Sequence, residues 1–358
     1  MDFTFTEDQL LFAESIKDFL QNEITPDLIR ASWDTENGRS DELWNKMVEL
    51  GLTAMLVPED QGGLGMRELD FILIAQECGR VALPEPLVDT ALVVTPLLKD
   101  LADVDARCVS LLEKLATGET RIAIGHAAND LVSDAHIVDY LLLTHGHQIH
   151  LVNKRDVNLV AQPSIDPSRK LFSVEWQPNE ESLLINGSNG VDLLAATLNR
   201  GALGTAAQLL GLAERIVEMT VQYTADRTQF GKPIGSYQAL KHHMANCAVK
   251  NEFSKATLHR AAYTVSEKPV HGDFAVSHAK LACGEAAVLA AKNGIQSHGA
   301  MGYTWECDLH IFMKRAWALD KFWGHPGFHK FRLHQWLMNP NAKIGADKTF
   351  GEQLSAAS

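Results

Sequence analysis

Glu306 lies in the stretch "SHGAMGYTWECDLH", residues 297–310, where two glycines and two large aromatic residues precede it. A carboxylate can act as a general base when its surroundings raise its pKa toward neutrality. The glycines would let the loop turn tightly, and Tyr303 and Trp305 would shield the acid from water. The stretch therefore predicts a loop that positions one base. The other interpretation is an exposed acid at the start of the helix that runs on through Leu309, where a negative charge is favourable.

Arg227 begins a second group of residues that could bind a charged ligand, in "DRTQFGKPIGSYQALKHHMA", residues 226–245. Its guanidinium offers a planar fork of N–H donors that suits phosphate oxygens. Taken alone, Arg227 is better interpreted as a solvated cation at a helix end that caps the carbonyls of its own helix.

Helices must position both groups, and the first part of the chain has clear helix signals. Thr6 followed by Gln9 forms a possible capping box before an apolar stripe of helical spacing. A second helix is expected to start near Ser40 and to stop at Gly51. A glycine-rich loop then leads into an apolar helix over residues 67–78. Residues 1–117 are predicted to form one α-helical domain.

The pattern changes after this domain. Residues 118–193 contain short segments rich in Val, Ile and Leu between Gly, Asn, Asp and Pro, which predicts a small β domain. Long helical periodicity with many small residues returns over residues 194–340 and predicts closely packed helices. Residues 341–358 form a polar tail that we expect to fray. The fold class is therefore mainly α with a central β domain.

The composition excludes several classes of protein. A formal net charge of −13 argues against a nucleic-acid surface, which needs clustered Lys and Arg. The N-terminus lacks a basic segment followed by an apolar one, and no run of about 18 apolar residues occurs. Five scattered cysteines form no C-x-x-C pair. The histidines have no carboxylate or cysteine at ligand spacing, so no metal site is expected. These features predict a cytoplasmic protein with no membrane or nucleic-acid partner.

Four segments together resemble the acyl-CoA dehydrogenase family. The most specific is "RTQFGKPI" followed by a Tyr-Gln helix; the others are "GLTAMLVPEDQGGLGM", "ECGR" and "QSHGAMGYTWE". They occur in the family's order and run over nearly the whole chain. The resemblance implies the acyl-CoA dehydrogenase fold: an N-terminal helical domain, a small β-barrel-like domain and a C-terminal four-helix bundle.

The resemblance also implies FAD, held between the β domain and the bundle, with its adenosine diphosphate end crossing a subunit interface. Arg227 and Gln229 match the positions whose side chains meet the FAD pyrophosphate of a neighbouring subunit. Phe230 matches the ring that packs against the cofactor. Gln296 and Gly299 match the loop over the neighbour's adenosine portion, where a small residue lets the backbone approach.

Within the resemblance, Glu306 matches the family's base in the form "GY-x-x-E". In the implied reaction a carboxylate removes the pro-R α-proton of an acyl-CoA thioester while the β-hydride passes to flavin N5, which leaves a trans-2-enoyl-CoA. A pKa raised by burial would favour proton abstraction at neutral pH. An electron-transfer acceptor would then reoxidise the flavin.

The chain departs from the family where the flavin ring would be held. The family segments "T-E-P-x-x-G-S-D" and "W-I-T-N" are absent from the predicted β domain, which is also short. The usual "G-T-x-E" near the C-terminus is replaced by "FWGHPGFHKFR", residues 322–332. The groups that reach a neighbour's FAD remain, whereas those that hold the ring within this chain are lost.

This pattern resembles the short subunits of heteromeric acyl-CoA dehydrogenases, in which a homologous longer chain holds the flavin of a heterotetramer. Such complexes act on steroid side chains and on dicarboxylic or other bulky acyl-CoAs. Three alternatives stay open: a self-sufficient homo-oligomeric dehydrogenase, a non-catalytic scaffold subunit, and a flavin oxidase or monooxygenase on the same fold. The identity of the acyl group does not follow from the ordinary apolar residues of the helices.

Overall fold

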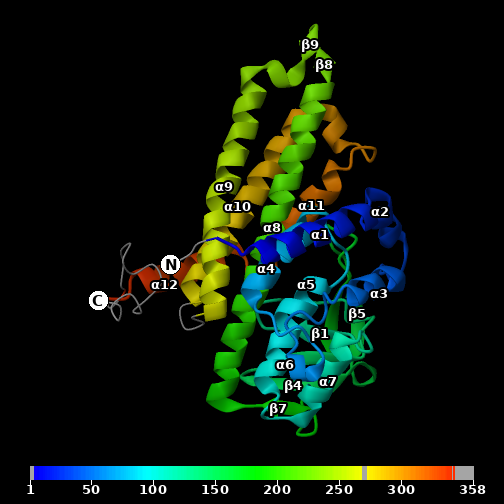
Figure 1. Ribbon diagram of the computed structural model, residues 1–358, viewed down its shortest axis with the longest axis vertical. Helices are drawn as coiled ribbons and strands as arrows, with labels where there is room; N and C mark the ends of the chain where they lie inside the picture. Colours follow the sequence, from blue (N-terminus) through cyan, green and yellow to red (C-terminus); the bar gives the residue numbers. More distant parts are fainter. Residues whose placement is uncertain (1–3, 268–271, 341, 343–358) are drawn as a thin grey trace.

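The computed structural model describes residues 4–267, 272–340 and 342. A helical N-terminal domain, a small β domain and a long helical bundle follow one another along the chain (Figure 1). This is the order that the sequence predicts. Apart from Ala342, the predicted tail over 341–358 lies outside the described residues.

The N-terminal domain begins as its helix signals predict. Thr6 caps the first helix, and its backbone N–H and side chain exchange hydrogen bonds with Gln9, so the capping box is confirmed. Ser40 caps α3, and Gly51 follows that helix with φ +74°. The helices are α1 (Glu7–Glu23), α2 (Pro26–Asp34), α3 (Asp41–Glu49), α4 (Glu68–Arg80), α5 (Leu87–Asp89), a π-helical turn (Thr90–Val94), α6 (Thr95–Leu101) and α7 (Ala106–Ala116).

Two small sheets form the β domain. One has the order β1-β3-β4-β7, in which β1 and β3 are parallel and the other pairs antiparallel; the second is antiparallel with the order β2-β6-β5. Their apolar faces share one buried cluster that includes Leu141, Val152 and Val132. The strands are β1 (Ile122–Gly125), β2 (Val132–Ser133), β3 (Tyr140–His145), β4 (Gln148–Asn153), β5 (Asn158–Gln162), β6 (Leu171–Glu175) and β7 (Leu183–Ile185).

The first helix of the bundle, α8 (Gly187–Asp226), starts earlier than the predicted boundary at residue 194. The sequence "NGSNG" suggests a turn because of its glycines, but the side chain of Asn186 accepts a hydrogen bond from Gly187 N and caps the helix. Gly190 is needed for a close approach rather than a turn, since a Cβ there would lie 2.0 Å from the carbonyl oxygen of His147. Tertiary packing therefore sets this boundary.

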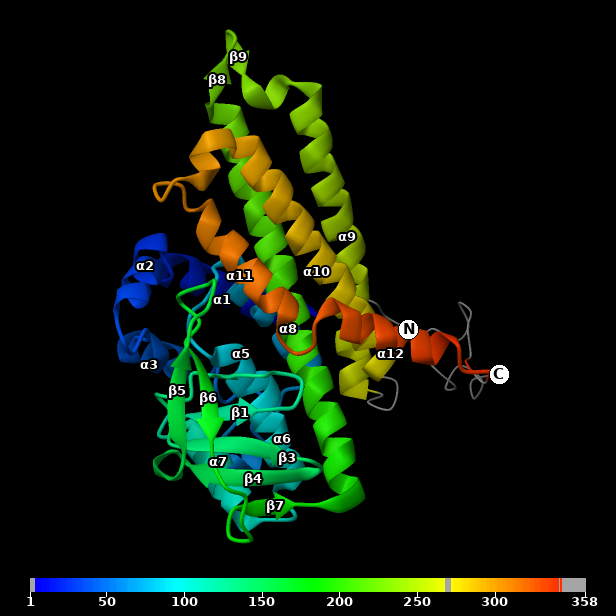
Figure 2. The ribbon, with the colours of Figure 1, turned by 180° about the vertical axis from the view of Figure 1, so that it is seen from behind.

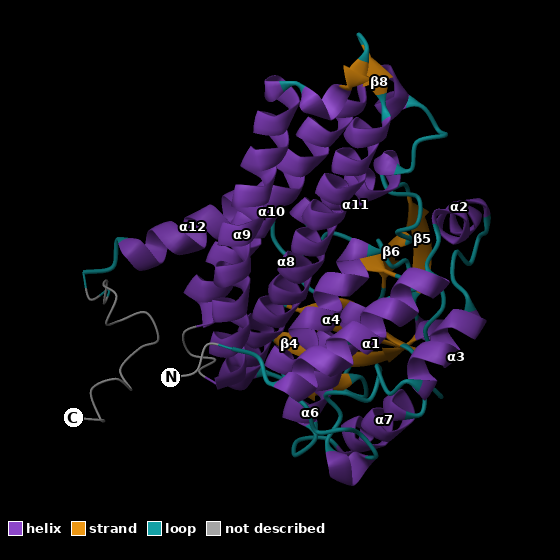
Figure 3. Cartoon of the chain, turned by 45° about the horizontal axis from the view of Figure 1, so that its top comes forward, coloured by secondary structure: helices purple, strands orange, loops and turns teal. Residues whose placement is uncertain are grey.

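Four long helices complete the predicted four-helix bundle: α8, α9 (Gln238–Glu267), α10 (Gly272–His298) and α11 (Leu309–Lys321). A two-stranded hairpin, β8 (Thr228–Gln229) and β9 (Lys232–Pro233), joins α8 to α9 at one end of the bundle. The last helix, α12 (Pro326–Leu337), packs on α10 and projects sideways from the bundle (Figure 2). Figure 3 shows the hairpin that contains β8 at the top of the bundle, apart from the strands of the β domain, which lie lower in the view.

Among the residues that the structure describes, one helix is long and apolar enough to cross a membrane, over Gly272–Tyr303. Most of its apolar window, 61%, is buried inside the bundle, where α10 packs against α8, α9 and α11. Its apolar character is therefore that of a core helix.

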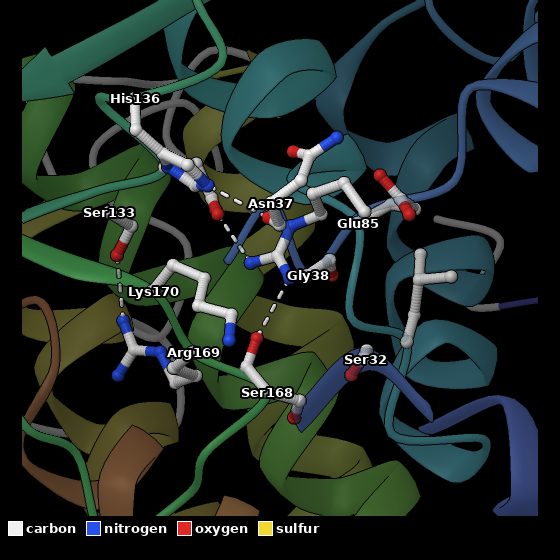
Figure 4. A network of polar contacts seen from close by, with 12 residues as sticks. Ser32, Asn37, Gly38, Glu85, Ser133, His136, Ser168, Arg169 and Lys170 are labelled. Carbon is white, nitrogen blue, oxygen red and sulfur yellow. Dashed lines mark hydrogen bonds and ion pairs between the residues drawn. The ribbon is translucent and has the colours of Figure 1, made fainter. Parts of the chain in front are cut away.

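Charged side chains join the three parts of the fold, and Figure 4 shows this contact region from close by. From the N-terminal domain, Arg39 pairs with Asp134 of the β domain and also donates to the carbonyl of Ser168 at 2.9 Å. From α11 of the bundle, Arg315 pairs with Asp166 and donates to Ser168 Oγ at 2.7 Å. Both ion pairs are buried. We call this contact region the three-domain junction.

Two further carboxyl groups at the junction lack an ion-pair partner among the described residues. Glu85 is 5% exposed; its Oε1 accepts from Ser40 N at 2.9 Å, and its Oε2 has no hydrogen-bond partner in the described part of the chain. Burial raises the pKa of Glu85 to about 7. Asp89 accepts a hydrogen bond from Trp323 Nε1 at 3.1 Å, and burial raises its pKa to about 6.

We predict that Glu85→Gln stabilises the protein at alkaline pH. The pKa of Glu85 is higher in the folded chain, about 7, than its ordinary value of 4.5. Its contribution to stability is therefore greatest below pH 4.5 and is lost as the pH rises through 7. Gln mimics the protonated acid, so urea unfolding at pH 8.5 should show a gain of roughly 1 to 3 kcal/mol, with little change at pH 5.

Glu119→Gln serves as the control, because Glu119 is an exposed acid. It should leave the unfolding free energy within about 0.5 kcal/mol at both pH values. Equal destabilisation by Glu85→Gln at both pH values would contradict the prediction and would mean that the carboxylate is needed as an ion.

Candidate functional site

Arg227, Gln229 and Phe230 lie on the hairpin at the end of α8, all exposed to solvent. The two-residue turn, Phe230–Gly231, has φ of +53° and +78°, which is the backbone that a tight hairpin requires. A positive φ is unfavourable for a bulky residue, and the Phe230 ring is 92% exposed, so packing within the chain does not compensate. Such a residue is a candidate for contact with another molecule.

The Arg227 side chain has no ion-pair partner among the described residues. Its backbone N–H closes α8 by donating to Tyr223 O at 2.9 Å, and its carbonyl accepts from Ile234 N at 2.8 Å. The main chain of Arg227 thus anchors the hairpin, and the guanidinium is left available. The interpretation of this side chain as a cap for its own helix finds no supporting hydrogen bond.

The structure places Gln296 and Gly299 at the same end of the bundle as the hairpin. The Tyr223 ring, one turn before Arg227, stacks on the His298 ring with centroids 4.1 Å apart. Gln296 and Gly299 are exposed, and a Cβ on Gly299 would meet no atom within 4 Å, although its φ is +60°. All five residues predicted to bind the cofactor therefore face solvent at the end of the bundle that carries the hairpin.

Glu306 lies on a loop beyond this end of α10, after a 3₁₀ turn over Gly299–Tyr303. Its carboxylate is exposed, and its pKa is lowered, because its own backbone N–H and the Thr304 side chain hydrogen-bond to it. The expectation of a pKa raised by burial is wrong for this chain. The expected shielding by aromatic rings is wrong as well, since Tyr303 is 79% and Trp305 66% exposed.

Trp305 instead holds the loop against the N-terminal domain. Its ring packs edge-on against Trp33 of α2, with centroids 6.1 Å apart, and Lys314 Nζ lies 4.2 Å from its centre. Arg30 of α2 pairs with Asp308 on the same loop. Trp305 and Asp308 therefore anchor the loop to α2.

Trp323, from the segment that replaces the family's "G-T-x-E", fills the three-domain junction. It is fully buried in a left-handed conformation, with φ +53°. Its Nε1 donates to Asp89 at 3.1 Å, and its backbone N–H donates to Asn129 Oδ1 at 2.7 Å. Its ring lies against α8 so closely that a Cβ on Gly201 would be 2.2 Å from the indole. One side chain thus contacts all three parts of the fold.

His329 of α12 fixes this conformation further. Its Nε2 lies 3.0 Å from the Trp323 carbonyl and its Nδ1 lies 3.1 Å from Ser277 Oγ, which suits a neutral imidazole that donates from Nε2. Burial lowers the pKa of His329 to about 3, so the ring stays neutral throughout the physiological range. Sequence reasoning marked the replaced segment but did not identify Trp323 as the residue that fills the junction.

The two segments that replace family motifs meet around one cavity. Its walls include residues 126–131 of the β domain and, from the end of α11 and the turn that follows, Lys321, Phe322, Gly324 and His325; its volume is about 680 Å³. Arg169 lies on this wall, as do Phe322 and Phe328. Sequence reasoning did not single out Arg169, which stands in a polar loop of the β domain and carries no motif.

Comparisons with known proteins agree with this architecture. Two family models match the chain, "Acyl-CoA dehydrogenase, N-terminal domain" over residues 6–132 and "Acyl-CoA dehydrogenase, C-terminal domain" over residues 188–326. The two ranges flank residues 133–187, which contain most of the β domain. Acyl-CoA dehydrogenase IpdE2 of Mycobacterium tuberculosis is 34% identical over 315 residues, which are 87% of this chain and 91% of that protein.

Solved structures with lower sequence identity share the fold. The ChsE4-ChsE5 complex from Mycobacterium tuberculosis matches with a TM-score of 0.81 at 22% identity, over 96% of this chain and 100% of the other. Glutaryl-coenzyme A dehydrogenase in complex with glutaryl-CoA matches with a TM-score of 0.82 at 21% identity, over 96% and 99% of the two chains. The chain belongs to the acyl-CoA dehydrogenase family and is an oxidoreductase that acts on a CH–CH bond.

Proposed function

We propose that this chain works as the short subunit of a heteromeric acyl-CoA dehydrogenase, with FAD carried by a homologous longer partner. One contrast carries the proposal: the groups that suit FAD face outward at the end of the bundle, whereas Trp323 closes the junction inside the chain. The complex would convert an acyl-CoA thioester to a 2-enoyl-CoA, and FAD, when bound, accepts the hydride from the β-carbon.

The outward-facing residues fit an anionic cofactor presented by another chain. Arg227 presents an exposed guanidinium fork for pyrophosphate oxygens, and Gln229 adds an exposed amide nearby. Phe230 offers an exposed ring for stacking, which would bury the apolar area that its strained backbone displays. Gly299 leaves open space for a close approach of the adenosine portion.

The junction, in contrast, fits a structural role. Its Trp323 ring is packed against Gly201 and hydrogen-bonded to Asp89, so opening it would expose a buried carboxyl group and a large apolar side chain. The β-domain segment beside it lacks the family motifs that contact a flavin ring. A site that cannot be completed within one chain is the expected property of a short subunit.

Two comparisons are consistent with such an assembly. The ChsE4-ChsE5 structure is a complex of two different chains. Another matching structure is described as a "steroid ACAD", with a TM-score of 0.82 at 19% identity. We extend the proposal to a bulky acyl group on this basis. A self-sufficient homo-oligomer is the alternative, and the cavity of about 680 Å³ beside the junction is the feature that favours it.

We expect the chain purified alone to be colourless and the chain co-expressed with its longer partner to be yellow. The measurement is the flavin absorption of the two preparations, followed by bleaching when an acyl-CoA is added without oxygen. A stable yellow preparation of this chain alone, reduced by acyl-CoA, would reject the short-subunit proposal. Rapid oxygen consumption during turnover would assign the complex to the oxidases or monooxygenases, and absence of bleaching in a yellow complex would favour a scaffold.

Arg227→Ala should weaken FAD retention in the assembled complex. A charge-assisted contact to a phosphate is worth roughly 1.5 to 3 kcal/mol, which is about ten- to a hundredfold in affinity. Flavin occupancy is measured after gel filtration at low FAD. Arg155→Ala is a matched control, because the Arg155 side chain is 81% exposed on the β domain, and it should leave occupancy unchanged. Equal occupancy in both variants would refute the role of Arg227.

Glu306→Gln should leave turnover of the complex within a few-fold of wild type. Its lowered pKa keeps the carboxylate ionised at neutral pH, and its exposure provides none of the tuning that a base in this reaction needs. The working base would then belong to the partner. Turnover is measured with a dye acceptor at matched flavin content. A loss of about a hundredfold or more, the effect of a lost general base, would show that Glu306 is catalytic.

A further inference from the structure

Arg169 is a half-buried cation beside acids that already bind other groups. Asp134 pairs with Arg39 and Asp166 pairs with Arg315, while Asp89 accepts from the Trp323 indole. For Arg169 itself, the described residues provide one hydrogen bond, from Nη2 to Ser133 Oγ at 3.0 Å (Figure 4), and no ion pair. Burial and the neighbouring Arg315 lower its pKa to about 10, which leaves it charged at neutral pH.

The guanidinium lies on the wall of the cavity between residues 126–131 and residues 321–325, which we call the Arg169 cavity. One face of the guanidinium is covered by the Phe322 ring, whose centre is 4.1 Å from Arg169 Cζ. The stacking holds the fork of donors in a fixed orientation, and its remaining N–H groups have no acceptor among the described residues.

The rest of the lining is mainly apolar or neutral. Phe328, Leu171 and Leu198 contribute apolar surface from α12, β6 and α8. His126 Nδ1 accepts from Ala128 N at 3.0 Å and its Nε2 lies 3.1 Å from Leu194 O, so this ring is a neutral imidazole with both nitrogens occupied. Of the other charged lining residues, Lys321 pairs with Asp320, and Asp130 is exposed.

We propose that the Arg169 cavity binds a small monocarboxylate with an apolar body, whose carboxylate pairs with Arg169. A volume of about 680 Å³ falls within the range of ligand pockets, roughly 300 to 1,000 Å³. One fixed guanidinium among aromatic and aliphatic walls matches one carboxylate, whereas a diphosphate would need several convergent cations or helix termini. This inference rests on the proposed function, because the cavity is available to such a ligand only if the chain does not hold a flavin there.

The test titrates the full-length chain with 4-cyclohexylbutanoate by isothermal calorimetry, with the corresponding amide and phenyl phosphate as comparison probes. We expect the carboxylate to bind at least about tenfold more tightly than the amide or the phosphate. Arg169→Met, which keeps the stacking on Phe322 but removes the charge, should weaken carboxylate binding by about ten- to a hundredfold. Arg155→Met, on an exposed arginine, should not change it.

A second variant distinguishes a loss of ligand binding from a folding defect in Arg169→Met. Ala127 is exposed on the cavity wall, so Ala127→Trp should fold and should block the cavity, with loss of carboxylate binding. The inference is overturned if the carboxylate does not bind or if the amide binds equally well. It is also overturned if Arg169→Met binds the carboxylate like wild type, because Arg169 would then not be the partner of the carboxylate. If the chain alone retains FAD, both the heteromeric proposal and this inference are overturned. If the chain alone is colourless and does not bind the carboxylate, only this inference is overturned.

Discussion

The fold depends on buried charge pairing where its three parts meet. Arg39 and Arg315 come from different domains, and both reach the loop of the β domain that contains Ser168. Removing one partner of such a pair would leave an uncompensated charge in the interior, which costs far more than an exposed pair contributes. The pairs therefore fix the β domain relative to the helices, even though replacing them all with apolar residues could be neutral for stability.

Trp323 fills the same junction with a fully buried side chain. Its ring occupies the space between Gly201, Asp89 and His126, and its left-handed backbone is held by Asn129 and His329. A strained conformation persists where its surroundings determine it from several sides, and these contacts come from α5, α8, α12 and the loop after β1. The junction around Trp323 is therefore rigid and closely packed, and the cavity of about 680 Å³ lies beside it.

The end of the bundle that carries the hairpin is exposed, in contrast to the closely packed junction. The hairpin and the turn after α10 expose an arginine without an ion-pair partner among the described residues, a 92% exposed Phe230 and a glycine with open space around it. Exposed aromatic and arginine side chains are typical of surfaces that another molecule covers. The contrast between a packed junction and exposed candidate cofactor residues is the observation that supports the proposed role as a short subunit. The loop with Glu306 belongs to this surface, since α2 holds it in place through Trp33 and Arg30.

The sequence by itself determined the order of the three parts and the N-terminal ends of α1 and α3, because these depend on local patterns and short motifs. It could not determine the start of α8, since Gly190, which suggests a turn, is required by the close approach of the His147 carbonyl. It also misjudged Glu306: glycines and aromatic residues near an acid suggest enclosure, but Trp305 packs on a helix that is distant in the sequence. The roles of Trp323, Arg169, Glu85 and Asp89 emerged only from the tertiary structure, because burial and the absence of a partner are properties of residues brought together from separate domains.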